Sequence, residues 1–175
     1  MTGSVNDIAR QIRLLIVDID GVMTDGGLQF DNRGEEYKTF NSLDGHGIRM
    51  LLDCGIEVAV ITGRNSGIVS HLMNELGVRH LYQGYRDKLL AYEKLLQDTG
   101  LESGQTAYVG DDLPDLPVMR RAGLAIAVQN AHAFVKQHCD WVTTARGGNG
   151  AVREVTDTIL QAQSLLAARQ DSYLE

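Results

Sequence analysis

Short apolar runs alternate with amphipathic stretches along almost the whole chain. The runs with the length and composition of buried strands are RLLIVDI, VAVITG, HLYQG, TAYVGDD, LAIAV and WVTT. Between them, hydrophobic residues recur with helical spacing over residues 47–54, 67–76, 88–99, 116–122, 131–138 and 151–168. This alternation predicts a parallel sheet with helices on both faces and right-handed crossovers. The expected fold class is a doubly wound, Rossmann-like α/β fold.

One segment departs from this alternation. Residues 26–40, GGLQFDNRGEEYKTF, have the pattern of two short strands around the turn sequence DNRG, which predicts a β-hairpin inserted after the first strand. Because two strands alone are only marginally stable in water, the hairpin is expected to pack on the domain or on another subunit. No linker, repeat or low-complexity tract divides the chain, so a single domain is predicted over residues 1–175.

The composition argues against several classes of partner. A net charge of −7 disfavours binding to a nucleic-acid backbone, and no window approaches the roughly 18 apolar residues of a membrane span. The N-terminal segment lacks the apolar core of a secretion signal. Cys54 and Cys139 have no metal-binding or redox spacing and are expected to be reduced thiols. We therefore expect a cytoplasmic protein with neither nucleic acid nor membrane as partner.

Polar residues stand where three of the predicted strands end, and a lysine opens one of the helices. They are Asp18, Asp20, Thr62, Arg64, Lys88, Asp111 and Asp112. Because ligands bind beyond the carboxyl ends of the strands in an open parallel sheet, we expect these side chains to converge. Any one of them alone could be a helix cap or a solvated surface residue, but the acids gather at two strand ends. So many carboxylates repel one another unless a divalent cation lies among them, and Mg²⁺ prefers such oxygen ligands.

Four motifs follow one another along the chain. They are DIDGVMTD (Asp18–Asp25), Thr62 within VITGR, Lys88, and GDDLPD (Gly110–Asp115). Their order and spacing resemble those of the haloacid dehalogenase superfamily of aspartate-nucleophile phosphatases. The resemblance implies that Asp18 is a nucleophile that forms an aspartyl-phosphate and that Asp20 is the general acid. Thr62 and Lys88 would hold phosphoryl oxygens.

The same resemblance implies a Mg²⁺ cofactor. The carboxylates of Asp18 and Asp111 and the backbone carbonyl of Asp20 would bind the ion. Asp112 would act through a water molecule or by orienting Lys88. The expected metal set is therefore Asp18, Asp20, Asp111 and Asp112.

A closer resemblance covers nearly the whole chain. The hairpin after DGVMTDG, together with FNSLDGHGIRML, ITGR, YVGDD and GGNGAVREV, is similar to the 3-deoxy-D-manno-octulosonate 8-phosphate phosphatase family. That likeness implies Mg²⁺-dependent hydrolysis of this eight-carbon sugar-acid phosphate, a step in lipopolysaccharide biosynthesis. It also implies that no separate cap domain is present. The family forms homotetramers in which the hairpin of one subunit helps to shape the site of its neighbour.

The family resemblance also implies a set of substrate contacts. They map onto Asp20, Asn41, Ser42, Leu43, Asp44, Gly45, Arg49, Arg64 and Lys88. The chain departs from the family pattern at three positions. Leu43 stands where an arginine is common, His46 where a tyrosine is common, and Leu72 where some members have an arginine. These departures weaken the substrate assignment and leave the phosphatase motifs untouched.

Other functions are open at this point. A phosphatase for nine-carbon sugar-acid 9-phosphates, of the sialic or KDN type, would share the hairpin and the missing cap. A phosphomutase usually carries a larger cap to exclude water. A phospho-receiver domain has its acid pair first and its phosphorylated aspartate on a later strand, which is the reverse of the order here. An inactive binding module would be expected to have lost one of Asp18, Asp20, Lys88 or Asp111, and all are present.

Overall fold

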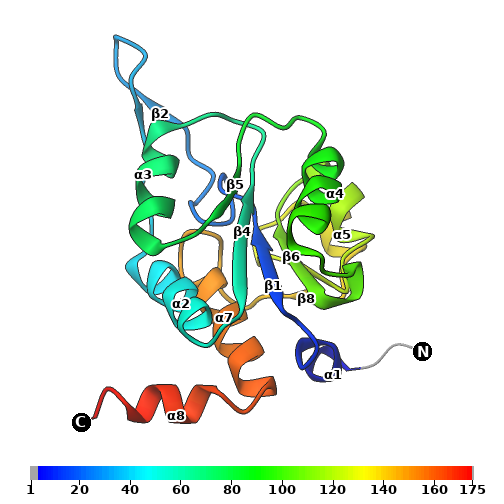
Figure 1. The fold of residues 1–175 in the computed structure, drawn as a ribbon. Coiled ribbons are helices and arrows are strands. Elements are labelled where there is room, and N and C mark those ends of the chain that lie inside the picture. The colour runs from blue at the N-terminus through cyan, green and yellow to red at the C-terminus, as the bar shows by residue number, and fades with distance from the viewer. Residues whose placement is uncertain (1–3, 175) are drawn as a thin grey trace.

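The apolar runs form a six-stranded sheet in the order β5-β4-β1-β6-β7-β8. A computed structural model describes residues 4–174 (Figure 1). The strands are β1 (Leu14–Val17), β4 (Glu57–Ile61), β5 (His80–Tyr82), β6 (Thr106–Gly110), β7 (Leu124–Ala127) and β8 (Trp141–Val142). All neighbours in this sheet pair in parallel, which confirms the doubly wound prediction. The chain runs outward from β1 through β4 to β5 and then crosses to β6 on the other side of β1.

Helices cover both faces of the sheet. Figure 1 shows α2, α3 and α7 on one face and α4 and α5 on the other. The helices are α1 (Val5–Ala9), α2 (Ser42–Asp53), α3 (Gly67–Leu76), α4 (Lys88–Thr99), α5 (Leu116–Met119), α6 (Ala133–Lys136), α7 (Ala151–Ala162) and α8 (Leu166–Asp171), with short 3₁₀ turns at Ser103–Gln105 and Leu113–Asp115. Over the described residues, the helices are too short or too polar for any of them to span a bilayer.

The first and last large helices differ from the prediction. α2 begins more than a turn earlier than its apolar pattern, because the Asn41 side chain accepts a hydrogen bond from the backbone N–H two residues on, at 2.9 Å. The predicted helix over 151–168 is two helices, α7 and α8, separated by Ser164 with a φ of 61°. Gln163 explains the break, since its side-chain amide donates to the carbonyl of Ile12 at 2.8 Å and ties the end of α7 to the segment before β1.

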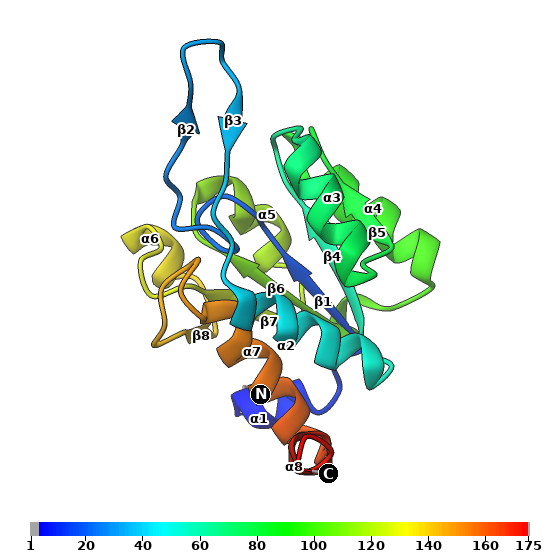
Figure 2. The same ribbon diagram turned by 90° about the vertical axis from the view of Figure 1, so that its left-hand side faces the viewer.

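The predicted hairpin is present and projects away from the body of the molecule (Figure 2). Its strands, β2 (Gln29–Phe30) and β3 (Glu36–Tyr37), pair antiparallel. The Asp31 carboxylate shapes the tip by accepting hydrogen bonds from two backbone N–H groups. No cap domain is inserted anywhere in residues 4–174. Three large apolar side chains on the hairpin are more than half exposed: Leu28, Phe30 and Tyr37.

Candidate active site

A pocket of about 390 Å³ opens at the carboxyl ends of β1, β4 and β6. It therefore lies where the chain changes direction across the sheet, as expected for a ligand site in this fold. The structure brings all seven strand-end and helix-start residues predicted from the sequence to this pocket: Asp18, Asp20, Thr62, Arg64, Lys88, Asp111 and Asp112. The expected catalytic set is thus gathered in one place.

The nucleophile predicted from the sequence directly follows β1, a fully buried strand. All four residues of β1 have no exposed surface, and burying each such aliphatic side chain contributes roughly 1.5–3 kcal/mol. The backbone N–H of Asp18 still donates to the carbonyl of Val109 on β6, at 3.1 Å. Asp18 is therefore held by the sheet itself, with only 7% of its surface exposed.

Lys88 joins two carboxylates at the floor of the pocket. Its ammonium lies 3.0 Å from Asp18 Oδ2 and 2.6 Å from Asp115 Oδ1. Lys88 is the first residue of α4, whose N-terminus is capped by the Asp87 side chain, so the helix start fixes its position. Although burial opposes its charge, the two carboxylates raise the pKa of Lys88 above its usual value. The lysine stays protonated and offsets part of the negative charge around it.

Asp115 has a larger role than the sequence predicted. It belongs to the GDDLPD motif, but no function was assigned to it. Its buried carboxylate accepts hydrogen bonds from Tyr108 Oη at 2.7 Å and from the backbone N–H groups of Asp111 and Asp112 at 2.9 and 3.1 Å. Asp115 therefore fixes both the loop after β6 and the Lys88 ammonium. Its spacing of four residues after Asp111 in a turn is the signal that could have identified it.

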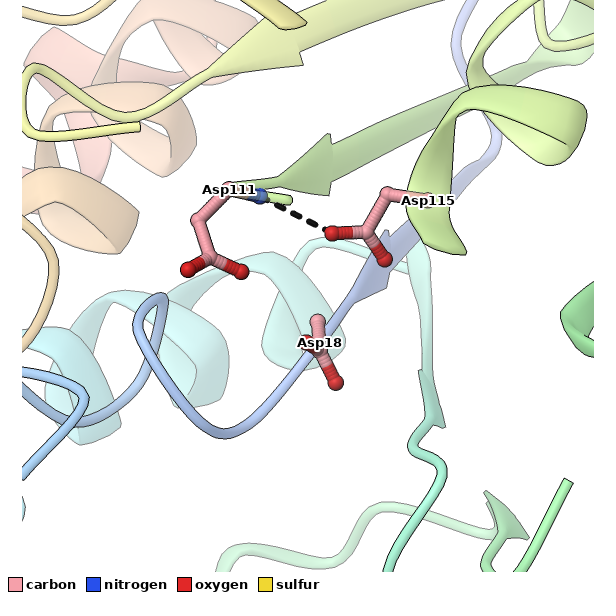
Figure 3. Close-up of side chains that lie close together, drawn as sticks. All are labelled: Asp18, Asp111 and Asp115. Carbon is pink, nitrogen blue, oxygen red and sulfur yellow. Dashed lines mark hydrogen bonds between the residues drawn. The ribbon is translucent and has the colours of Figure 1, made fainter. Parts of the chain in front are cut away.

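Three carboxylates gather around one point, as Figure 3 shows. Oxygen atoms of Asp18, Asp111 and Asp115 all lie within 4.8 Å of one another. With the Lys88 ammonium beside them, three negative charges and one positive charge leave a net charge of −2 when all are ionised. A divalent cation would neutralise this charge, and oxygen atoms are its preferred ligands. The donor set therefore fits the predicted Mg²⁺.

The electrostatics of this cluster support the same conclusion. Burial first, and then the charge of Asp115, raise the pKa of Asp18 to about 7. Burial and the charges of Asp115 and Asp18 likewise raise the pKa of Asp111 to about 7. Raised values of this kind mark carboxylates whose charge is only partly compensated, here by Lys88. A bound cation supplies that charge and keeps the ligands ionised.

Asp112 lies at the pocket but outside this cluster. One of its carboxylate oxygens accepts a hydrogen bond from the backbone N–H of Leu113 at 2.8 Å, and the residue caps the 3₁₀ turn that contains Asp115. The contacts of Asp112 are therefore those of a helix cap, which is the alternative role that the sequence analysis gave to acids at strand ends. Its place in the metal set remains a prediction.

The Asp20 carboxylate is held by residues that the sequence did not single out. Lys38, which directly follows β3, contacts Asp20 Oδ1 and lies 3.2 Å from Glu36 Oε1. Glu36 also accepts from Arg64 Nη2 at 2.6 Å, and the Arg64 guanidinium lies over the Phe30 ring. Although partial burial alone would raise it, hydrogen bonds and the Lys38 charge lower the pKa of Glu36. The alternation along a strand places Glu36 and Lys38 on one side, but nothing local indicates that this side meets Asp20.

Most of the predicted substrate-contact loop does not reach the catalytic pocket of its own chain. Asn41, Ser42, Gly45 and Arg49 line a second pocket of about 470 Å³ between α2 and α3. The Arg49 guanidinium donates to a backbone carbonyl at the end of α3, at 3.0 Å. Leu43 is 57% exposed and lines neither pocket. Two of the three departures from the family pattern, His46 and Leu72, also border the second pocket.

Asp44 requires a correction. It was expected to contact substrate, but it has no exposed surface. Its carboxylate accepts hydrogen bonds from the backbone N–H groups of Arg153 at 2.8 Å and Gly150 at 3.3 Å. These amides open α7, where a carboxylate is favoured by unpaired donors and the helix dipole. Asp44 therefore joins α2 to α7 and is closed to a substrate.

Arg86 is a further pocket residue that sequence reasoning missed. It lies on the loop between β5 and α4, two residues before Lys88, and its side chain is exposed at the pocket. Lys38, Arg64 and Lys88 all pair with acids, whereas Arg86 pairs with no carboxylate among residues 4–174. Its charge is thus available to a ligand.

The chain is similar to proteins of known fold and activity. A family model described as haloacid dehalogenase-like hydrolase matches residues 80–155. The 3-deoxy-D-manno-octulosonate 8-phosphate phosphatase KdsC of Yersinia pestis is 51% identical over 158 residues, which is 90% of this chain and 84% of that protein. A crystal structure of the phosphatase from Yersinia pestis superposes with a TM-score of 0.92 at 50% identity, covering 93% of this chain and 88% of that one.

A second solved structure carries bound ligands. The 3-deoxy-D-manno-octulosonate 8-phosphate phosphatase of Moraxella catarrhalis, in complex with magnesium, phosphate and KDO, has a TM-score of 0.94 at 42% identity. The match covers 96% of this chain and 97% of that chain.

The fold and the aspartate–lysine cluster define a hydrolase of the haloacid dehalogenase type, and its three carboxylates could hold a metal ion such as the magnesium bound by the Moraxella catarrhalis phosphatase. The identity of about one half to KdsC phosphatases, over nine-tenths of the chain, defines the family more narrowly. The chain belongs to the 3-deoxy-D-manno-octulosonate 8-phosphate phosphatase family.

Proposed function

We propose that the protein hydrolyses 3-deoxy-D-manno-octulosonate (KDO) 8-phosphate to KDO and phosphate, a step toward lipopolysaccharide. The observation that carries the proposal is the grouping of Asp18, Lys88, Asp111 and Asp115 at one pocket. This grouping occurs in a chain about half identical to KdsC phosphatases over nine-tenths of its length.

We assign the chemistry to the chain's own side chains. An oxygen of Asp18 attacks phosphorus, and the bond from phosphorus to the sugar oxygen breaks. Asp20 gives its proton to the leaving oxygen and then takes a proton from the water that attacks the aspartyl-phosphate, so phosphate leaves and both acids return to their starting states. Thr62 and Lys88 face the phosphoryl oxygens and offset charge that develops on them.

The metal would be held by the carboxylates of Asp18 and Asp111, with the Asp20 backbone carbonyl as the third predicted ligand. When bound, Mg²⁺ supplies the positive charge that keeps the carboxylates ionised and balances the phosphoryl group. Asp115 would keep the Asp111 loop and Lys88 in place around it.

A sugar-acid phosphate carries a carboxylate as well as a phosphate. The floor of the pocket, with Asp18 and Lys88 each less than a tenth exposed, is where phosphorus must meet the nucleophile. Arg86 is exposed at the same pocket and has no acidic partner in the described part of the chain. We therefore assign Arg86 to an anionic group at the far end of the substrate, which arginine binds well.

We also propose a homotetramer in which the hairpin of one subunit completes the site of a neighbour. The exposed side chains of Leu28, Phe30 and Tyr37 support this assembly, because apolar groups on a projecting two-stranded element need a covering surface. Light scattering of the purified protein measures the assembly directly. A monomeric mass at working concentration would contradict it.

The cellular setting and the domain count complete the proposal. We propose a single domain over residues 1–175 that works in the cytoplasm, where the free Cys54 and Cys139 would remain reduced.

The deciding experiment is phosphate release from a panel of sugar-acid phosphates, with Mg²⁺ and after full chelation by EDTA. KDO 8-phosphate should have the highest kcat/KM, and activity should vanish with the metal. A higher kcat/KM for a nine-carbon sugar-acid 9-phosphate would move the assignment to that substrate. Full activity after chelation would contradict the metal-dependent reaction itself.

A further inference from the structure

Lys38 lies buried against the Asp20 carboxylate, although it belongs to none of the catalytic motifs. Its side chain is 2% exposed. The ammonium contacts Asp20 Oδ1, 18 residues earlier in the chain, and lies 3.2 Å from Glu36 Oε1. A buried ammonium needs such partners, because an unpaired buried charge is strongly destabilising. The return strand of the hairpin is thus tied to the end of β1.

These charges balance within a small network. Glu36 binds both Lys38 and Arg64, and Arg64 Nε lies 3.7 Å from Asp20 Oδ2. With both acids ionised, the two acids and two bases carry no net charge, and protonation of Asp20 at Oδ2 leaves the contact between Oδ1 and Lys38 in place. Lys38 therefore has neither excess charge nor exposed surface to offer a phosphate, in contrast to Arg86. Its contacts indicate action through Asp20.

The two oxygens of Asp20 have different surroundings. Oδ1 is held by Lys38. Oδ2 accepts no hydrogen bond from any residue in the range 4–174, and Asp20 itself lines the catalytic pocket. One oxygen is thus fixed and the other remains open for proton transfer. This is the arrangement that a general acid requires.

We propose that Lys38 is a positioning residue that fixes the Asp20 carboxylate for proton transfer to the leaving oxygen. The pair formed by Glu36 and Arg64 holds Lys38 in turn. The inference rests on the proposed function, since it takes Asp20 as the general acid. The orientation of the Asp20 side chain then depends on the hairpin as well as on β1.

Protonation by Asp20 matters for some leaving groups and not for others. A sugar alkoxide is a poor leaving group and must receive a proton as its bond to phosphorus breaks, whereas p-nitrophenolate leaves without one. Misplacing the acid therefore slows phosphoryl transfer from an alkyl phosphate to Asp18 and spares transfer from an aryl phosphate, whereas the later attack of water on the aspartyl-phosphate is the same for both substrates. A general loss of structure slows both reactions alike.

The test compares KDO 8-phosphate with p-nitrophenyl phosphate at saturating Mg²⁺. In Lys38→Met, the rate of leaving-group release in a single turnover should fall about 100-fold with the sugar phosphate and change no more than about threefold with the aryl phosphate. Asp20→Asn should show the same selectivity, and Lys38→Arg should recover much of the loss. Lys94→Met, at an exposed lysine paired with Asp98 on α4, is the matched control and should leave both reactions unchanged.

Equal losses of the single-turnover rate on both substrates, no loss on either, or weaker substrate binding with an intact single-turnover rate would each overturn the proposal. If Lys38→Met does not fold, Glu36→Gln provides the second test, with a smaller loss in the same selective pattern expected. Failure of the proposed function is seen separately, in a wild-type protein that does not hydrolyse KDO 8-phosphate. The selectivity is then measured with an alkyl phosphate that the wild type does hydrolyse.

Discussion

Gly21 leaves the space that the Asp111 carboxylate occupies. A Cβ atom on Gly21 would stand 2.1 Å from Asp111 Oδ2, and the residue has a φ of +92°. The backbone that follows Asp20 and the carboxylate after β6 thus approach so closely that no side chain fits between them. This approach brings the ends of β1 and β6 together at the proposed metal site.

Replacing Gly21 by alanine should therefore displace Asp111. We expect Gly21→Ala to weaken Mg²⁺ binding and to lower kcat by about tenfold or more, while backbone strain costs about 1 kcal/mol. Calorimetric titration of Mg²⁺ and phosphate release measure the two effects. Gly55→Ala is the control, because Gly55 lies away from the catalytic pocket and has a φ of +77° with no atom within 4 Å of the added Cβ. Equal metal affinities in the two variants would contradict the expectation.

Asp18→Asn should abolish turnover without unfolding the protein. Loss of an activated nucleophile typically costs about 10⁴-fold or more in kcat. Because burial and Asp115 already oppose the charge of Asp18, the neutral amide should raise the melting temperature of the metal-free protein at pH 8. Phosphate release and thermal unfolding monitor the two outcomes. Substantial activity in the folded variant would remove Asp18 from the reaction.

Mg²⁺ binding should tighten as pH rises from about 6 to about 8. Asp18 and Asp111 have pKa values of about 7, raised by burial and by neighbouring carboxylates. A carboxyl group with a raised pKa contributes stability that is complete below its usual value of 3.8 and is lost as pH rises through 7. The metal-free protein should thus lose stability over this interval, and the increase in melting temperature on adding Mg²⁺ should grow.

Thermal unfolding at several pH values, with EDTA or with saturating Mg²⁺, checks both trends. The variant Asp111→Asn should flatten the pH dependence of the metal effect. A metal-induced shift of the same size at pH 6 and pH 8 would be inconsistent with proton release from these carboxylates.

Arg86→Ala should raise KM for KDO 8-phosphate. Loss of a hydrogen bond to a charged group costs roughly 1.5–3 kcal/mol, which corresponds to about 10- to 150-fold. The KM for p-nitrophenyl phosphate, which has no carboxylate, should stay within about twofold of the wild type. Arg10→Ala, at an exposed arginine of the N-terminal region paired with Asp7, serves as the control. A rise in KM on both substrates would place Arg86 at the phosphate instead.

Local sequence patterns were enough to predict the sheet and the residues that meet at the catalytic pocket. β1 is a continuous apolar run that is buried on both faces, and the period-2 segment after it forms the hairpin. The residues that end β1, β4 and β6 meet because parallel strands bring their carboxyl ends to one edge. These relationships depend on alternation and strand ends, which the sequence displays directly.

Contacts between segments far apart in the sequence could not be predicted from local patterns. The carboxylate of Asp44 accepts from Gly150 and Arg153, more than a hundred residues away, and nothing near Asp44 signals this. Lys38 meets Asp20 only because the chain, on leaving β3, returns past the end of β1. The break at Ser164 likewise depends on where Gln163 finds its carbonyl partner.

The loop before α7, residues 146–150, affects the order in which the active site can form during synthesis. Gly147 lies so close to Gly21 that a Cβ would stand 1.7 Å from the Gly21 carbonyl oxygen, and Gly148 donates to the carbonyl of Val22 at 2.9 Å. The nucleophile is among the first residues to be synthesised, but the loop that follows it takes its final support from residues made near the end. During synthesis, Asp18 is therefore present long before the loop that follows it is fully supported. The active site can reach its final structure only after the last quarter of the chain has been made.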